Sequence, residues 1–151
     1  MILNEAPVAP SMLAAVGATA LLAAVFGFLY VRDRQRSAYL LPWLIAWLFS
    51  FLKFSLSFVM ELAPAMQWLR PVHQTFALGA GYAILFGAIR MSGMCFARCM
   101  AFPFAAAWIW MMAAFLSGGS FLFVSLPVFW LVGLAFIKAG VTIIRQGSGS
   151  L

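Results

Sequence analysis

Three ionisable side chains in this sequence occupy positions from which they could bind or react with another molecule. Lys53 is the one charge well inside an apolar stretch of 23 residues, Ala38 to Met60. A charge in such a stretch is costly and usually faces the interior of a helix bundle, so Lys53 is a candidate for a substrate, ion or signal site. Glu61 follows eight residues later, close to the same helical face, and could partner it. The alternative is that the lysine side chain extends to the membrane surface.

His73 is the only histidine and lies at the predicted start of another apolar stretch. A single histidine cannot build a metal site, which needs several ligands. It could respond to pH near neutrality, and a solvated histidine at the membrane surface is the alternative interpretation.

Two cysteines lie four residues apart, so a helix would place Cys95 and Cys99 on one side. Thiolate and thioether ligands suit Cu(I), and three methionines are close by: Met91, Met94 and Met100. Because methionine is frequent throughout this chain, we predict no metal site and keep the two cysteines as weak candidates only.

Known catalytic motifs are absent. The sequence contains no HExxH, P-loop or GxGxxG motif and no Ser-His-Asp arrangement, and its three acidic residues leave little for acid–base catalysis. We therefore expect neither enzymatic activity nor a cofactor in this chain.

The composition predicts which elements position these residues. The chain is 66% hydrophobic and 8% charged with a mean hydropathy of +1.08, whereas soluble domains carry roughly 25% charged residues. This predicts an all-α, polytopic bundle, multi-pass in the inner (plasma) membrane, formed by one domain over residues 1–151. The expected spans cover residues 11–31, 38–60, 72–89, 100–116 and 121–144, with a loop over residues 61–71.

Charge asymmetry predicts the orientation. Six arginines lie on one side of these spans, and they are Arg32, Arg34, Arg36, Arg90, Arg98 and Arg145. The other side carries Arg70, so the positive-inside rule places the N-terminus outside and the C-terminus in the cytoplasm. Because the basic residues follow the ends of apolar runs, the net charge of +6 is explained by topology and not by nucleic acid.

Two stripes of small residues recur at a spacing of four and would let helices approach closely. The first comprises Ala15, Thr19, Ala23 and Gly27, and the second comprises Thr75, Gly79, Ala83 and Gly87. Alanine-rich spans also show such stripes by chance, so the sequence leaves both interpretations open.

Three blocks carry a resemblance to a known class of proteins. They are AYLLPWLIAWLFSFLKFSL from Ala38 to Leu56, GYAILFGAIRMSG from Gly81 to Gly93, and FWLVGLAFIKAGVTIIRQGSGSL from Phe129 to Leu151. This pattern resembles the N-terminal membrane sensor regions of bacterial histidine kinases and diguanylate cyclases. The resemblance implies a multi-helix input module whose parent continues into a cytoplasmic output domain, and it implies that this chain is a fragment.

Our sequence-based hypothesis is a sensory or anchoring module of a bacterial signal-transduction protein. Its expected partners are the lipid bilayer, a second copy in a homodimer, and a cytoplasmic signalling domain in cis. The alternative is a small transporter or channel subunit with Lys53 lining the path.

Overall fold

The protein is described by a computed structural model for residues 8–33, 40–91 and 101–148. Five α-helices and one short 3₁₀ helix form this part of the chain. Their bounds are α1 Val8–Arg32, α2 Leu40–Leu62, η1 Pro64–Leu69, α3 Arg70–Met91, α4 Ala101–Leu116 and α5 Phe121–Ser148. The predicted all-α bundle is therefore confirmed.

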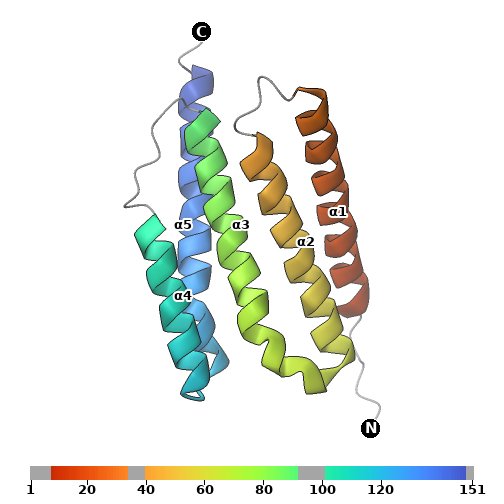
Figure 1. The fold of residues 1–151 in the computed structure, drawn as a ribbon, viewed down its shortest axis with the longest axis vertical. Coiled ribbons are helices and arrows are strands. Elements are labelled where there is room, and N and C mark those ends of the chain that lie inside the picture. The colour runs from red at the N-terminus through yellow and green to blue at the C-terminus, as the bar shows by residue number, and fades with distance from the viewer. Residues whose placement is uncertain (1–7, 34–39, 92–100, 149–151) are drawn as a thin grey trace.

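The helices are arranged around α3, which packs between α2 and α5 (Figure 1). α1 packs on α2, and α4 packs on α5 and α3. Within the described residues, α1 contacts no other helix than α2, and α2 contacts neither α4 nor α5. The bundle thus consists of an α1–α2 pair and an α3–α4–α5 group, which meet where α2 and η1 contact α3.

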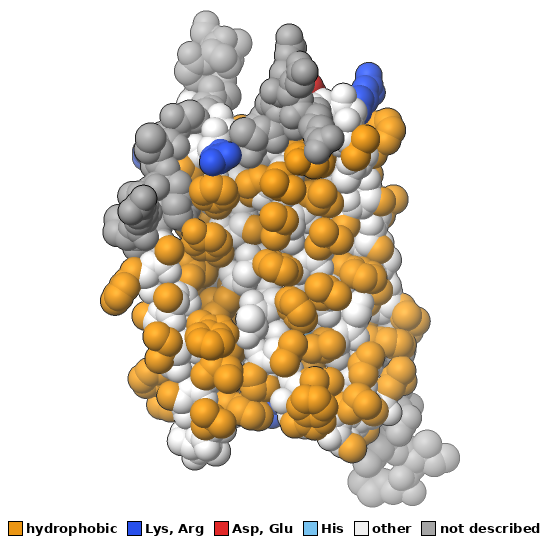
Figure 2. All heavy atoms as spheres, in the orientation of Figure 1, with side chains coloured by type: hydrophobic (Ala, Val, Ile, Leu, Met, Phe, Trp, Pro, Cys, Tyr) orange, Lys and Arg blue, Asp and Glu red, His pale blue; other side chains and the backbone are white. Residues whose placement is uncertain are grey.

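The outer faces of the bundle are apolar along its length. Large hydrophobic side chains such as Leu21, Phe28 and Trp130 are about two-thirds exposed, and orange side chains cover the face seen in Figure 2. Among the described residues, four helices are long and apolar enough to cross a membrane. The shorter α4 has 16 residues, or ~24 Å, against a hydrocarbon core of ~30 Å. A surface of this kind is suited to lipid.

The predicted loop over residues 61–71 was wrong. α2 continues to Leu62, η1 occupies Pro64–Leu69, and α3 already begins at Arg70. Pro64 begins the short helix, where its fixed φ suits helical geometry and its missing N–H removes no bond. The connection therefore holds the end of α2 and the start of α3 close together.

The turn between α4 and α5 is set by glycine. Gly118 has a φ of 72°, and the N–H groups of Gly118 and Gly119 donate to the carbonyls of Phe115 and Ala114 at 3.1 and 2.9 Å. This is the Schellman arrangement that ends helices at a left-handed residue. Ser120 then caps α5 by accepting the Phe123 N–H at 3.4 Å. The turn places the start of α5 beside the end of α4.

Arginines gather at one end of the bundle. α1, α3 and α5 run in the same direction and end with Arg32, Arg90 and Arg145 in their last turns, at the upper end in Figure 1. Arg70 begins α3 at the opposite end. This separation is the one on which the predicted orientation depends, and the orientation itself stays a prediction.

Candidate functional site

A cleft of about 330 Å³ lies near the end of the bundle at which α1 begins, the lower end in Figure 1. α2 and α3 contribute most of the polar residues of its lining, which are Lys53, Ser57, His73 and Gln74. α1 contributes Ser11, Met12 and Ala15, α2 adds Phe54, and α5 contributes Phe121 and Phe129. We call this site the polar cleft. α1 packs on α2 and α5 packs on α3, and within the described residues α1 and α5 make no contact. The cleft therefore has one wall on each side of the α2–α3 interface.

Two hydrogen bonds organise the polar residues of the cleft. The hydroxyl of Ser57 and Nε2 of His73 lie 2.7 Å apart and link α2 to α3. The Gln74 amide donates to Oγ of Ser125 at 3.1 Å and links α3 to α5, and both of these side chains are almost completely buried. Oε1 of Gln74 is also buried and has no partner among the described residues. A buried acceptor without a donor is unfavourable.

Lys53 is the cation of the polar cleft. It is half-buried, nine residues before the end of α2 or ~14 Å along the helix axis, and its ammonium lies 4.8 Å from the centre of the Phe54 ring. The structure gives it no ion pair within the described residues. Placing a lysine in a membrane span costs about 2.5–3.5 kcal/mol on insertion scales. A bound anion would offset part of this cost.

The structure brings Lys53 and His73 together in one cleft, and it does not bring Glu61 there. Glu61 is exposed near the end of α2 and is not part of the cleft lining. Glu61, the partner that helical spacing predicted for Lys53, is therefore not in the cleft, and His73, which was identified separately, shares the site.

A second cation stands at the rim. The Arg70 guanidinium lies 5.3 Å from the centre of the Phe121 ring, and Phe121 lines the cleft. Arg70 also donates to Oε1 of Gln67 at 2.6 Å. Among the described residues no carboxylate lines the cleft, so the described lining is positive in character.

The small-residue stripe on α1 faces α2. Thr19 and Ala23 are buried, and a Cβ at Gly27 would lie 3.7 Å from the Leu44 side chain. The Thr19 hydroxyl donates to the Ala15 carbonyl at 2.8 Å, so it is satisfied within its own helix. Ala15 also lines the polar cleft.

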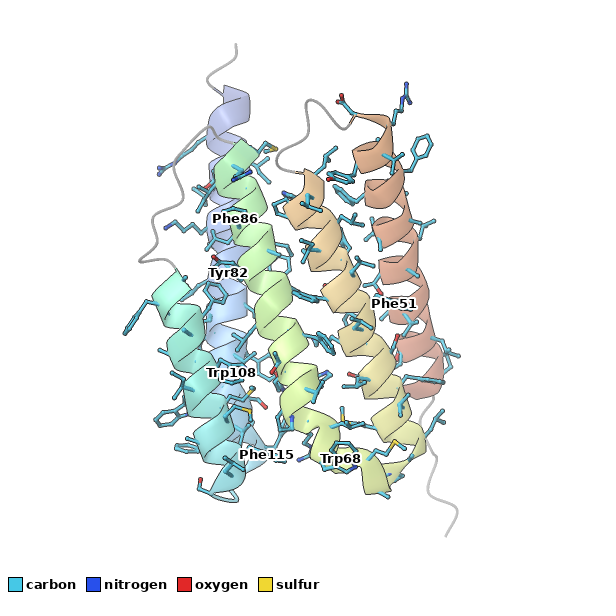
Figure 3. The ribbon with its side chains drawn as sticks, viewed as in Figure 1. Phe51, Trp68, Tyr82, Phe86, Trp108 and Phe115 are labelled. Carbon is cyan, nitrogen blue, oxygen red and sulfur yellow. The ribbon has the colours of Figure 1, made fainter. Side chains whose placement is uncertain are left out.

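The stripe on α3 is divided between two neighbours. Gly79 and Gly87 face the rings of Phe49 and Trp43 on α2, and the buried Ala83 packs in one cluster with Ala46. Thr75 instead accepts the Trp108 indole N–H from α4 at 3.1 Å; Figure 3 shows Trp108 on α4 beside α3. Gly79, Ala83 and Gly87 therefore belong to the interface between the two parts of the bundle.

The weak metal candidates Cys95 and Cys99 lie outside the described residues. Among the residues that the structure describes, no group of three or more His, Cys, Asp or Glu side chains could hold a metal ion.

Sequence reasoning missed Ser57, Gln74 and Ser125 as functional candidates. Each is an uncharged polar residue inside an apolar helix, close to the end of α2 or to the start of α3 or α5. The topology brings these helix ends together. Polar residues at similar depths in three predicted spans could therefore have indicated a shared site from the sequence.

Comparisons with known protein families, curated proteins and solved structures found no match to this chain. The geometry of the site therefore carries the functional argument.

Proposed function

We propose that this chain is a membrane-embedded sensory module whose input site is the polar cleft. The observation that carries the proposal is the division of the bundle. The cleft is lined by both the α1–α2 pair and the α3–α4–α5 group, and within residues 8–33, 40–91 and 101–148 the helices of these two parts meet where α2 and η1 contact α3. A molecule bound in the cleft would contact both parts at once and change the angle between them.

The α2–α3 interface is suited to such a movement. Gly79 and Gly87 bring the α3 backbone close to aromatic side chains of α2. Small changes in packing at these positions would therefore change the distance and angle between α2 and α3. Interfaces of this kind have discrete packing arrangements, and a difference in affinity between two arrangements is what lets a ligand shift their populations.

The movement would reach the far end through α3 and α5. The Gln74–Ser125 hydrogen bond joins these helices at the cleft. Farther along, a Cβ at Gly81 would lie 3.1 Å from Val132, and Leu85, Ile89 and Ala135 form a buried cluster. α3 and α5 therefore move together, and α5 would deliver the change at the end where Arg90 and Arg145 lie. This proposal agrees with the resemblance to sensor regions of kinases and cyclases.

The mechanical part of the proposal is tested by a distance measurement. We would place nitroxide labels at the exposed Ile45 and Val141 through cysteine substitutions, with Cys95 and Cys99 replaced by serine. Double electron–electron resonance in lipid nanodiscs would compare this protein with the Gly79→Leu/Gly87→Leu variant. We expect a shifted distance distribution in that variant and an unchanged one for Gly17→Leu, whose added side chain would meet open space. Equal distance distributions in all three proteins would contradict the proposed movement between the two parts of the bundle.

Signalling is tested in two steps. The nucleotide sequence downstream of codon 151 is determined first. If it encodes an in-frame kinase or cyclase domain, the activity of that domain is then measured. Gly79→Leu/Gly87→Leu should then change that activity with normal membrane insertion, while Gly17→Leu should not. A frame without an output domain, or unchanged activity, would reject the sensory proposal.

The position of Lys53 favours a second candidate, a transporter or channel subunit for a small anion. The observation behind it is the positive lining of the cleft, which includes no carboxylate from the described part of the chain. Chloride release from proteoliposomes, followed with an ion-selective electrode, would test it with Lys53→Met as the inactive variant. The sensory proposal predicts no release from either protein.

A further inference from the structure

We propose that the polar cleft binds an anionic amphiphile, with the acidic head group at Lys53 and the hydrocarbon chain along the aromatic residues of α5. The binding itself is argued from the cleft alone. Only its role as the input signal rests on the sensory proposal. Both a free fatty acid and an anionic phospholipid carry this combination of a negative head group and an aliphatic chain.

The charge of the cleft selects an anion. Lys53 lines it and has no ion pair within the described residues, and Arg70 stands at its rim against Phe121. The two acidic residues in the described part of the chain are elsewhere: Asp33 follows α1 at the opposite end, and Glu61 is exposed outside the lining. Inside a bilayer, where an unpaired cation is unfavourable, an anionic head group is the natural counterion.

The head group also meets hydrogen-bonding groups. Ser57 and His73 line the cleft with Lys53 and are joined by one hydrogen bond at 2.7 Å, and a hydroxyl or imidazole N–H of this pair can donate to an anion. Such a cluster disfavours a hydrocarbon tail in the same place, because apolar atoms would leave the Lys53 ammonium and the remaining donors and acceptors of Ser57 and His73 unsatisfied. The polar end of the ligand therefore belongs at α2 and α3.

The opposite walls suit an aliphatic chain. Met12 of α1 and Phe121 and Phe129 of α5 line the cleft, and Phe121 and Phe129 are about half exposed. Because the backbones of α1 and α5 do not approach each other among the described residues and Phe121 and Phe129 are half exposed, we infer that the cleft opens between these helices toward the surrounding lipid. Its volume of about 330 Å³ is within the range of ligand sites. An amphiphile can therefore enter sideways from the bilayer without passing through water.

Photolabelling of the whole chain tests the ligand class. The chain in phosphatidylcholine nanodiscs would be irradiated with a diazirine-bearing palmitic acid or with the methyl ester of that acid, and the label would be located by mass spectrometry. We expect the acid to label peptides containing Phe54, Phe121 or Phe129 about tenfold more than the neutral ester does. Lys53→Met should lower labelling by about tenfold or more, as when one partner of a buried charge pair is removed. Lys53→Arg should retain it.

Two controls make the result specific. Lys138→Met removes an exposed lysine of α5 outside the cleft and should leave labelling unchanged. Unlabelled palmitate and phosphatidylglycerol would be compared as competitors, and competition by palmitate alone identifies a free acid, while competition by phosphatidylglycerol identifies a membrane lipid. Equal labelling by acid and ester, or undiminished labelling of Lys53→Met, would overturn the inference. Photolabelling measures binding and not movement. Its failure would therefore reject the ligand but not the sensory proposal, which the nitroxide distances test independently.

Discussion

The contact between Gly79 and Phe49 gives the sharpest test of the interface that joins the two parts of the bundle. A Cβ at Gly79 would lie 2.7 Å from Cδ2 and Cε2 of the Phe49 ring, whereas ordinary contacts begin near 3.4 Å. The ring would therefore have to retreat by about 0.7 Å, the difference between those two distances. Its retreat is restricted, because the Phe49 ring also packs against Phe76 with 5.8 Å between ring centres. Gly79→Ala should destabilise the bundle for this reason.

The expected magnitude follows from two opposing terms. Overpacking a well-packed interior costs about 1–3 kcal/mol. Alanine in place of glycine inside a helix gains about 1 kcal/mol. The matched control is Gly140→Ala on α5, where an added Cβ meets nothing within 4 Å and only the favourable term applies. The two variants should thus differ by about 1–3 kcal/mol in free energy of unfolding, with Gly79→Ala the less stable.

The assay is reversible unfolding of the purified chain in mixed micelles, followed by circular dichroism as the fraction of sodium dodecyl sulfate rises. Adding Phe49→Leu removes the ring that Gly79 faces. In that background Gly79→Ala should behave like Gly140→Ala. The reasoning is refuted if the two alanine variants shift the free energy of unfolding equally in the original chain, or if their difference persists without the ring.

Two further predictions use the same unfolding measurement. Gly118→Ala should lower the free energy of unfolding by about 1–2 kcal/mol, because the φ of 72° in the α4–α5 turn disfavours a side chain; Gly17→Ala, in a right-handed helix with open space, should not, and equal effects would contradict this account. Gln74→Leu should cost about 1–3 kcal/mol by leaving the buried Ser125 hydroxyl without its partner on α3. Adding Ser125→Ala should recover most of that loss, and a purely additive double variant would argue against the bond.

The helices could be predicted from the sequence because long apolar runs bounded by arginine or proline leave few alternatives. α1 and α5 extend only a few residues beyond the expected spans 11–31 and 121–144. The loop over residues 61–71 could not be predicted correctly, because whether a short polar segment after a span coils into a 3₁₀ helix depends on how closely the next helix returns. α4 was expected among the spans, yet its length sets it apart from the other four helices.

The candidate site was predictable only in part. Lys53 and His73 were identified singly, since a charge or a lone histidine in an apolar chain is conspicuous. Their meeting in one cleft depends on the antiparallel pairing of α2 with α3 and on the tight connection between them. The expected partner Glu61 was chosen by helical spacing along one helix, whereas the cleft draws its residues from four helices. Spacing within a helix cannot reveal neighbours that come from other helices.

The small-residue stripes and the charged site, which the sequence presents as separate features, belong to one arrangement in space. The α1–α2 pair is held together by the stripe on α1, and the α3–α4–α5 group by Gln74–Ser125 and by Thr75–Trp108. In the part of the chain that the structure describes, the contacts of α2 and η1 with α3 join these two parts, and the polar cleft lies across them. On our proposal, a molecule that draws Lys53 toward α5 would turn α2 against Gly79 and Gly87, so that occupancy of the cleft and packing at the two glycines would be coupled. On this reasoning, substitutions at the glycines should alter photolabelling of the cleft although neither glycine lines it.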